Sequence, residues 1–395
     1  MVERQKKKFT FRGRNSEIGG DLNLAQDIQL YGRNYTAFLN GDAMGKSIQG
    51  AGGALVLGTV FRSILNRTLQ SSQMQQRHPE QWLKQSFLEL QDTFVTFDGS
   101  MLISLVMGLV EESTGLVYYI NAEHPWVALY RNGKASFIED DLSLRKIGVE
   151  GLNGQLIIKT FAMQPEDVLI IGSDGRDDIL LGHEENGTRI INEDEQQFLR
   201  RIEDGRGRLE GIEQAILAQG ELTDDFTLIR ISYREGIHEP EETDLNHSKQ
   251  EAARAKALYK EGRRSEALKL VDELMKQDRL HPEAVRAVAR ICIREKQFDR
   301  ARDLCLRVTE ELPTDSNFLY YTSYVLKHLQ EYEAAADFGE RCRLREPQNV
   351  QNLVNLADIY RLMGNEQRAE MLIDLARNIN PDHDHVKQYM AAVQR

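Results

Sequence analysis

The segment YTAFLNGDAMGKS, residues 35–47, begins as an apolar run and continues as a stretch with one aspartate and two glycines. Residues 35–40 have the aromatic and apolar content of a β-strand, and the glycines that follow are typical of a turn. The sequence therefore predicts a strand that ends in a turn carrying Asp42. A single aspartate at a strand end is common, because aspartate favours turns, so Asp42 alone identifies no function.

Three more acidic positions stand at the edges of predicted strands. Asp174 follows the run VLIIG at 168–172, Asp224 precedes the run 226–231, and Asp21 follows two glycines. A sandwich of strands would gather these positions at one end, and crowded carboxylates need cations to offset their repulsion. Oxygen ligands with flanking glycines suit hard ions such as Mg²⁺ or Mn²⁺, whereas a structural zinc site would need a Cys/His cluster.

The rest of the first half consists of short β-rich runs and two longer helical segments at 48–69 and 79–94. Hairpin turns are predicted at 113–115 and at Asn132-Gly133, where the chain needs positive φ angles. This pattern is typical of an antiparallel α+β domain. The predicted strands are 35–40, 102–110, 116–121, 126–130, 155–161, 168–172 and 226–232.

Six motifs, taken in order, resemble the SpoIIE-type bacterial branch of the type 2C protein phosphatases. They are EIGGD (17–21), GDAMGKS (41–47), FVTFDGSMLISLVMGLV (94–110), YYINAEHP (118–125), IIGSDGRDD (170–178) and TDDFTLI (223–229). The resemblance implies an antiparallel β-sandwich flanked by helices. It also implies a binuclear Mn²⁺ or Mg²⁺ centre that hydrolyses phosphoserine or phosphothreonine.

The resemblance assigns roles to individual residues. The implied metal ligands are Asp21, Asp42, the backbone carbonyl of Ala43, Asp174 and Asp224. Asp42 would bridge both ions and act with Asp174 through a metal-activated water. Asp21 would hold the second ion partly through water, and Glu17 would position that water. Asp225 is less expected to coordinate.

Two motifs depart from the family pattern. Glu123 replaces the glycine of the usual AGHP segment, and GGDFYD has become Gly-Gly-Asp-Leu-Asn-Leu. Both changes concern the substrate-facing rim and not the metal ligands. Only 16 residues precede Glu17, where the family usually has a helix and a further strand. A truncated form and a fragment of a longer chain both remain open.

Two other features allow more than one interpretation. His124 is either an acid for the leaving alkoxide or a structural or rim residue, and its position before Pro125 favours the second. The glycine-rich segment GAGGALVLG, residues 50–58, lacks the GK[ST] ending of a P-loop. We therefore predict that these glycines allow close helix packing.

The second half of the chain has a helical pattern with a period of 34 residues. Small residues recur in two registers where paired helices approach closely, and prolines stop the second helix of each pair. The pattern resembles the tetratricopeptide repeat and predicts about four repeats and a final capping helix. The two registers and the prolines are Ala267, Ala301, Ala335 and Ala369; Ala255, Ala289, Ser323 and Ala357; and Pro313, Pro347 and Pro381.

These patterns divide the chain into three segments. We predict a phosphatase-like domain at 8–235, an acidic linker at 236–245, and an all-α repeat array at 246–395. The three cysteines lie in the array at helix positions where other repeats carry Leu, Val or Ile, so we interpret them as reduced packing residues. A reducing compartment, most simply the cytoplasm, follows.

Composition excludes two classes of partner. A formal net charge of −12 argues against nucleic acid, which is bound by clustered Lys and Arg. No uncharged apolar stretch approaches the roughly 20 residues of a transmembrane helix, so no transmembrane segment is predicted.

The predicted function is metal-dependent hydrolysis of phosphoserine or phosphothreonine on a bacterial signalling protein. By family analogy the substrate is an anti-sigma-factor antagonist or a similar protein. The repeat array would dock the partner or substrate as a peptide in its groove. The alternative is a catalytically silent phosphatase-like scaffold that displays the repeats to partners.

Overall fold

The structure is a computed structural model in which the chain forms two compact units, residues 1–236 and 237–395. It describes residues 1–11, 14–45, 48–140, 144–150, 156–192, 194–234, 242–277 and 280–393. Residues 236–241 of the predicted linker lie outside the described residues, as do Lys46 and Ser47 of the GDAMGKS motif. The two units are described separately below.

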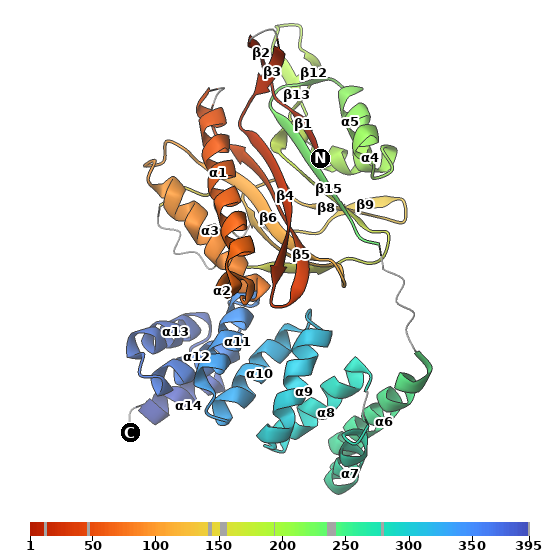
Figure 1. Ribbon diagram of the computed structural model, residues 1–395, viewed down its shortest axis with the longest axis vertical. Helices are drawn as coiled ribbons and strands as arrows, with labels where there is room; N and C mark the ends of the chain where they lie inside the picture. The colour runs from red at the N-terminus through yellow and green to blue at the C-terminus, as the bar shows by residue number, and fades with distance from the viewer. Residues whose placement is uncertain are drawn as a thin grey trace. The chain divides into compact units, whose positions relative to one another are not determined.

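The N-terminal unit is built on two five-stranded antiparallel sheets (Figure 1). The first has the order β1 (Val2–Arg4), β15 (Phe226–Ser232), β11 (Val168–Gly172), β8 (Ala128–Arg131) and β9 (Lys134–Phe137). The second has the order β10 (Lys159–Ala162), β7 (Leu116–Ala122), β6 (Ile103–Glu111), β5 (Arg33–Ala43) and β4 (Asp21–Leu30).

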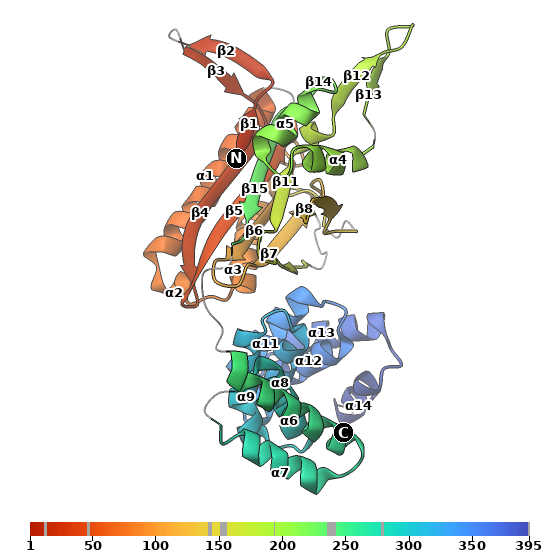
Figure 2. The same ribbon diagram turned by 90° about the vertical axis from the view of Figure 1, so that its right-hand side faces the viewer.

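Two smaller β elements flank one end of these sheets. A hairpin is formed by β2 (Lys7–Phe11) and β3 (Arg14–Ile18), and a three-stranded sheet by β13 (Arg189–Ile191), β12 (Ile179–His183) and β14 (Glu221–Leu222). Figure 2 shows β2–β3 and β12–β13 projecting from the same end of the unit, where β3 leads into β4. The helices of this unit are α1 (Ile48–Gln70), α2 (Ser72–Gln75), α3 (Pro79–Val95), α4 (Gln196–Asp204) and α5 (Leu209–Leu217).

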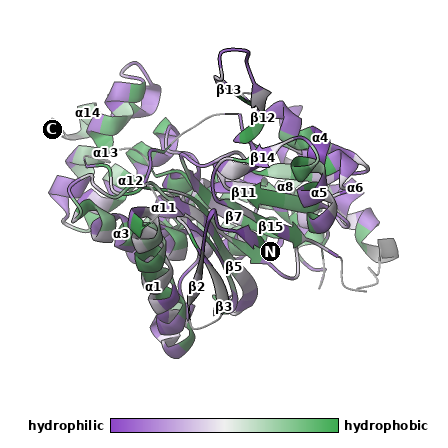
Figure 3. Cartoon of the chain, turned by 90° about the horizontal axis from the view of Figure 1, so that it is seen from above, coloured by the Kyte–Doolittle hydropathy of each residue, from purple (hydrophilic) through white to green (hydrophobic). Residues whose placement is uncertain are grey.

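The two five-stranded sheets pack face to face around an apolar core. Phe38 and Val106 from one sheet lie in the same buried cluster as Leu169, Ile171 and Ile229 from the other. Helices α4 and α5 cover the outer face of the β11–β15 sheet, and α1 and α3 cover the outer face of the β4–β7 sheet. Figure 3 shows the consequence: β7 and β11 are largely hydrophobic, while the helices carry both kinds of residue.

Most predicted elements of this unit are present within two or three residues of their expected limits. The turn at 113–115 joins β6 to β7, and Asn132 and Gly133 have φ angles of 51° and 81°. One prediction about the site is wrong: Asp42 lies inside β5 and not on a turn. The strand continues through Ala43, because Asp42 and Ala43 pair with Ser104 and Ile103 of β6.

Helix α1 is the only described helix long and apolar enough to cross a membrane. Its buried residues include Leu57, Phe61 and Leu65, and the helix lies against β4 and β5. Gly53 is needed at this contact, because a Cβ there would stand 2.6 Å from the Cβ of Ala43. The glycine-rich segment therefore packs closely against the sheet, as predicted, in the manner of a core helix.

The C-terminal unit consists of helices alone in the part that the structure describes. Helix α6 already begins inside the predicted linker 236–245, because the acidic residues there favour a helix N-terminus. The capping helix predicted after residue 382 is α14. The helices are α6 (Glu242–Lys260), α7 (Arg264–Leu274), α8 (Pro282–Arg294), α9 (Phe298–Glu311), α10 (Ser316–His328), α11 (Tyr332–Arg345), α12 (Val350–Leu362), α13 (Glu366–Ile379) and α14 (Asp384–Val393).

The 34-residue period corresponds to pairs of packed helices. All eight small residues of the two registers are buried, and the prolines at 313, 347 and 381 each follow the second helix of a pair by two residues. Cys292, Cys305 and Cys342 are fully buried, and burial raises the pKa of Cys305 and Cys342 to about 12. Their role in packing, as predicted, follows from this burial.

A largely buried carboxylate links two repeats. Glu340 on α11 accepts hydrogen bonds from Arg343 and Arg368, each at 2.7 Å, and from the Tyr360 hydroxyl at 3.0 Å. Although burial alone would raise the pKa of Glu340, Arg343 and Arg368 lower it to about 2. The ionised carboxylate is therefore more stable in the folded protein than in the unfolded chain.

Replacing Glu340 by glutamine is expected to lower the free energy of unfolding of the repeat unit by about 2–3 kcal/mol at neutral pH. The folded-state pKa is depressed, so this stabilisation is present above the ordinary pKa and disappears as the pH falls toward about 2. Denaturant unfolding followed by far-UV circular dichroism measures it. Glu333→Gln, an exposed position on the same helix, is the control and should change stability by less than about 0.5 kcal/mol.

Candidate metal centre

Asp21 and Asp42 face each other across two neighbouring strands. Asp21 begins β4, Asp42 is the second-last residue of β5, and the strand register pairs them directly. Residues paired in this way lie on the same face, with Cβ atoms about 4.5–5.5 Å apart, and like charges there repel. Gly20 permits the approach, because a Cβ at this position would stand 2.6 Å from the carbonyl oxygen of Ala43.

The opposite sheet contributes Asp174 and Asp224. Asp174 begins a single 3₁₀ turn, η1 (Asp174–Arg176), directly after β11, and Asp224 stands just before β15. A Cβ on Gly175 would lie 1.9 Å from the carbonyl oxygen of Asp225, so only glycine allows η1 to approach the start of β15 this closely. Four predicted positions thus lie at the same end of the sandwich, two from each sheet.

The carboxylates at this end repel one another. Burial, followed by the charge of Asp42, raises the pKa of Asp21 well above its ordinary value. Burial and the charge of Asp224 raise the pKa of Asp42 to about 6. Burial, followed by the charges of Asp42 and Asp178, raises the pKa of Asp174 to about 7. Negative charge at this site is therefore poorly compensated within the chain.

The donor set is chemically suited to a hard divalent cation, since it consists of carboxylate and carbonyl oxygens with excess negative charge. Among the described residues, however, no three His, Cys, Asp or Glu side chains are placed closely enough to hold a metal ion. The set therefore fits such an ion in charge and donor type, and its carboxylates would have to converge further to enclose one.

Glu17 and Asp225 make other contacts. Glu17, an exposed residue of β3, accepts a hydrogen bond from the Gln5 backbone at 3.0 Å and forms an ion pair with Lys8 at 3.3 Å. The Gln5 hydrogen bond is the main cause of its lowered pKa. Asp225 accepts hydrogen bonds from the backbone N–H groups of Gly20 at 2.7 Å and Lys6 at 2.6 Å. It thereby positions the turn that precedes Asp21.

Two charged residues near the carboxylates were not predicted from the sequence. Lys146 lies next to Ile147, which forms a β-bridge with Ile103, the partner of Ala43. Its ammonium lies 3.3 Å from the Met44 sulfur, and its charge partly offsets the raised pKa values of Asp42 and Asp174. Lys146 belongs to no motif, so nothing in the sequence marked it as a residue of the site.

Asp178 is the second of these residues. The sequence did mark it, because it is the last residue of the motif IIGSDGRDD. Burial, followed by the charge of Asp224, raises the pKa of Asp178. The backbone carbonyl of Asp178 accepts hydrogen bonds from both the N–H and the hydroxyl of Thr223. Asp178 therefore adds a further carboxylate beside Asp224.

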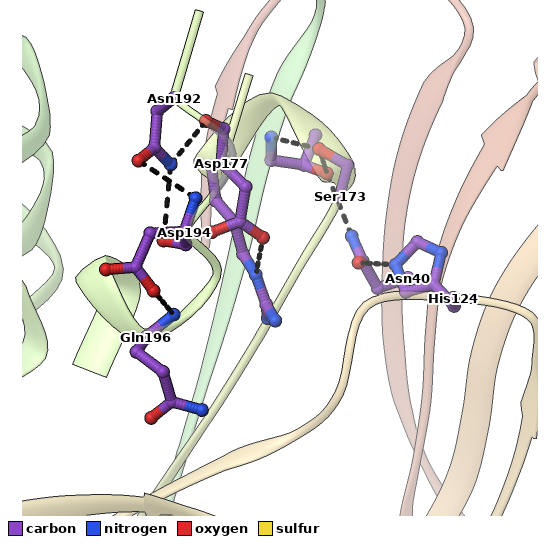
Figure 4. A network of polar contacts seen from close by, with 9 residues as sticks. Asn40, His124, Ser173, Asp177, Asn192, Asp194 and Gln196 are labelled. Atoms are coloured by element: carbon purple, nitrogen blue, oxygen red, sulfur yellow. Dashed lines mark hydrogen bonds and ion pairs between the residues drawn. The ribbon is translucent and has the colours of Figure 1, made fainter. Parts of the chain in front are cut away.

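A buried polar network lies between the sheets beneath the carboxylates (Figure 4). The Asn40 amide donates hydrogen bonds to Asn23 at 2.7 Å and to the Thr227 hydroxyl at 2.9 Å. That hydroxyl lies 3.2 Å from both a carboxylate oxygen of Asp21 and the hydroxyl of Ser173. The network therefore connects Asp21 to the turn that carries Asp174.

His124 completes this network on its other side. Its Nε2 lies 2.6 Å from the side-chain amide oxygen of Asn40, and its Nδ1 lies 2.9 Å from the Ser104 hydroxyl. Burial, followed by the charges of Arg176 and Lys146, lowers the pKa of His124 to about 3. A buried, neutral imidazole with both nitrogens engaged serves as a structural residue, which favours this interpretation over the general-acid one.

A second set of contacts, also drawn in Figure 4, lies between η1 and the start of helix α4. Asp177 forms an ion pair with Arg176 at 3.1 Å, and its backbone carbonyl accepts a hydrogen bond from Asn192. Asp194 accepts a hydrogen bond from the backbone N–H of Gln196 at the start of α4. These contacts hold the turn that carries Asp174 against the helical layer.

Glu123 occupies a backbone position that favours glycine. Its φ angle is 50°, in the left-handed region, where the family's AGHP segment would have a glycine. The carboxylate of Glu123 accepts a hydrogen bond of 3.4 Å from the backbone N–H of Lys146. Glu123, which stands in place of the family's glycine, therefore connects the hairpin region to the segment that carries Lys146.

In the metal-free protein, the N-terminal unit is expected to lose stability as the pH rises from about 4, the ordinary pKa of an aspartate, to about 7, the folded-state pKa of Asp174. A raised folded-state pKa stabilises the fold at low pH, and this contribution is lost as the pH passes through the values of about 6 for Asp42 and about 7 for Asp174. Thermal unfolding followed by tryptophan fluorescence measures this unit alone, since both tryptophans, Trp82 and Trp126, lie in it.

The matched comparison is the double variant Asp42→Asn/Asp174→Asn, whose Tm should fall less over the same pH range. Although part of Asp174 is buried, the residue as a whole is open to solvent, so water screens part of the repulsion from its neighbours, and Asp42 should contribute the larger share. An equal fall in both proteins would contradict the assignment of the repulsion to these residues.

Comparison with known families supplies the identity of both units. The sequence pattern of the family described as Stage II sporulation protein E (SpoIIE) matches residues 32–234, and that of the tetratricopeptide repeat matches residues 258–320. Glu17 and Asp21 lie before the first matched range. No curated protein matches the chain in sequence.

Three solved structures are among those to which parts of this chain are similar. The RsbU and RsbW domains of Rv1364c from Mycobacterium tuberculosis are 16% identical, with 62% of this chain and 66% of that chain covered and a TM-score of 0.42. The PP2C phosphatase domain and regulatory fragment of SpoIIE from Bacillus subtilis are 13% identical, with coverages of 56% and 59% and a TM-score of 0.43. The TPR protein YrrB is 14% identical, with coverages of 38% and 76% and a TM-score of 0.35.

This chain spans less than two thirds of the length of the first two structures. The SpoIIE match, by contrast, covers just over half of this chain and lies entirely within the N-terminal unit. The fold of that unit, with antiparallel sheets between helical layers, agrees with the helix-flanked β-sandwich expected from the sequence motifs. The chain belongs to the family described as Stage II sporulation protein E (SpoIIE) and carries tetratricopeptide repeats in its C-terminal unit.

Proposed function

We propose that the N-terminal unit hydrolyses phosphoserine and phosphothreonine on a bacterial signalling protein in the cytoplasm, and that the repeats dock this substrate or a partner. The observation that carries the proposal is the cluster of mutually repelling carboxylates of Asp21, Asp42 and Asp174 at one end of a SpoIIE-family sandwich. Family analogy makes an anti-sigma-factor antagonist the first substrate to test.

The residues that would hold two Mn²⁺ or Mg²⁺ ions are Asp21, Asp42, the backbone carbonyl of Ala43, Asp174 and Asp224. Bound ions would supply an activated water and offset charge on the phosphoryl oxygens. Other residues of the chain would hold these ligands in place. Asp225 holds the turn before Asp21, and the Thr227 hydroxyl lies within hydrogen-bond distance of the Asp21 carboxylate. Glu17 is proposed to position a water.

Hydrolysis of p-nitrophenyl phosphate by the full chain, with and without Mn²⁺, tests the reaction. Activity should require the metal, disappear with a chelator, and fall at least about a hundredfold in Asp174→Asn. Asp27→Asn is the matched control, because Asp27 is an exposed aspartate of β4 whose side chain has Thr36 as its only hydrogen-bond partner among the described residues. Metal-independent activity, or equal activity in both variants, would overturn the proposal.

The substrate is identified by comparing phosphoproteins in cells that carry the unaltered chain or Asp174→Asn. A true substrate should stay phosphorylated only in the cells with the variant. If no phosphoprotein differs although the purified chain hydrolyses p-nitrophenyl phosphate, the reaction type stands and the proposed protein substrate does not.

The scaffold alternative has one observation in its favour, since no three described acidic, His or Cys side chains are placed closely enough to hold an ion. Under this alternative, Mn²⁺ would not bind. Titration of the chain with Mn²⁺, followed by the Tm of the tryptophan-containing unit, separates the two functions. The phosphatase proposal requires a Tm increase that is largest above about pH 7, where the carboxylates are ionised.

A further inference from the structure

A positively charged pocket of about 350 Å³ lies between helices α6 and α8 of the repeat unit. One carboxylate, Glu283, lines it, and the whole chain has a formal net charge of −12. The pocket is therefore a local concentration of positive charge in an acidic protein. Its six cationic residues are Lys249, Lys256 and Lys260 on α6 and Arg286, Arg290 and Arg294 on α8.

Most of these cations lack a partner of opposite charge. Arg286 forms ion pairs with Glu283 at 3.4 Å and Asp315 at 2.7 Å, but the other five form none with any residue that the structure describes. Elsewhere in the array, arginines commonly pair with an acid three or four positions away, as Arg307 does with Glu311 at 3.1 Å. The positive charges in the pocket therefore repel one another, and an anionic ligand would relieve this repulsion.

Aromatic rings hold two of the guanidinium groups in place. The Arg290 guanidinium lies 5.6 Å from the ring centre of Phe318 and 5.7 Å from that of Tyr321, and Arg294 lies 5.9 Å from that of Tyr259. The Nε of Arg290 is buried and has no hydrogen-bond partner. Ring contacts of this kind orient a guanidinium while leaving N–H groups free for a carboxylate, which reduces the entropy lost on binding.

The spacing of the cations matches an extended chain. Arg286, Arg290 and Arg294 follow one another at intervals of four residues, or about 6 Å along a helix. Alternate side chains of an extended peptide are about 6.6–6.8 Å apart and point the same way. The two guanidinium groups without an acidic partner among the described residues, those of Arg290 and Arg294, can each bind a carboxylate through two hydrogen bonds. Ala287 and Ile291 also line the pocket and leave apolar surface for the intervening peptide atoms.

We propose that this pocket binds an extended protein segment with acidic side chains at alternate positions. The inference rests on the proposed docking role of the repeats and names the chemistry of the docked segment. A peptide is favoured over a nucleic acid, because a long polyanion would be repelled by the acidic remainder of the chain, whereas a short segment engages only the pocket.

Binding is measured with the full chain and a fluorescein-labelled hexapeptide of alternating glutamate and alanine, by fluorescence anisotropy. The peptide should bind at least tenfold more tightly than its glutamine counterpart, and affinity should fall as NaCl is raised. The charge reversal Lys256→Glu/Arg294→Glu should weaken binding at least tenfold. The neutralised variant Lys256→Gln/Arg294→Gln should weaken binding about threefold. This second variant tests the proposal if the charge-reversed chain does not fold.

The matched control is Lys269→Glu, an exposed position on α7 outside the pocket. Its affinity for the peptide should stay within twofold of the unaltered chain. Equal binding of the glutamate and glutamine peptides, an equal loss in the control, or tighter binding of a dT₆ oligonucleotide than of the peptide would each overturn the inference. Because p-nitrophenyl phosphate hydrolysis is assayed separately, failure of this site is distinguishable from failure of the proposed phosphatase reaction.

Discussion

Replacing Asp42 by asparagine is expected to lower Mn²⁺-dependent hydrolysis of p-nitrophenyl phosphate by about a thousandfold. Asparagine keeps the shape of the side chain but removes the charge that lies opposite Asp21 in the β4–β5 pair. Asp42 is also the residue proposed to serve both metal ions, so its loss should be felt more strongly than that of Asp174. Steady-state rates over a range of Mn²⁺ concentrations measure the effect.

The same variant should be more stable than the unaltered chain when no metal is present. Burial and the charge of Asp224 raise the pKa of Asp42, so its ionised form costs free energy in the fold at neutral pH. A higher Tm together with lost activity would exclude misfolding as the cause, and Asp27→Asn should change neither. Retention of more than a tenth of the activity would contradict the role assigned to Asp42.

Several parts of the fold could be read from the sequence because the determining contacts are local or periodic. The 34-residue period specifies which residues meet between paired helices, and all eight small residues of its two registers are buried. The apolar strands β6, β7 and β11 are likewise buried along their whole length. Patterns of this kind require only the ordinary spacing of helices and strands.

Strand β4 shows why other parts were missed. It has polar residues on its exposed face, such as Asp27 and Gln29, and it pairs with β5 through the turn at Tyr31-Gly32. Both turn residues have positive φ angles, 46° and 73°, but Tyr-Gly is not one of the sequence pairs that mark such a hairpin. The strand is therefore recognised only once its partner is known.

The candidate site divides in the same way. Aspartates at strand ends were visible in the sequence, because Asp42, Asp174 and Asp224 stand beside apolar runs and Asp21 follows two glycines. The residues beneath them were not, since Asn40 meets His124 and Thr227 from positions 84 and 187 residues further along the chain. Contacts of this range depend on how the two sheets pack, for which a single sequence carries no local signal.

Replacing Asn40 by leucine is expected to destabilise the N-terminal unit by about 3–5 kcal/mol. Asn40 is fully buried, donates hydrogen bonds to Asn23 and Thr227, and lies 2.6 Å from the Nε2 of His124. Leucine has the same branching but no polar atom, so three buried groups lose a partner at about 1–3 kcal/mol each before relaxation. Urea unfolding followed by tryptophan fluorescence reports this unit without interference from the repeats.

Asn34→Leu is the matched control, because Asn34 lies on the same strand but is exposed, and its change should be below about 0.5 kcal/mol. The Asn40 variant should also weaken Mn²⁺ binding, since Thr227 loses the donor that fixes its hydroxyl beside Asp21. A loss below about 1 kcal/mol would mean that water replaces the amide, and that the network fills the space between the sheets without holding Asp21 in place.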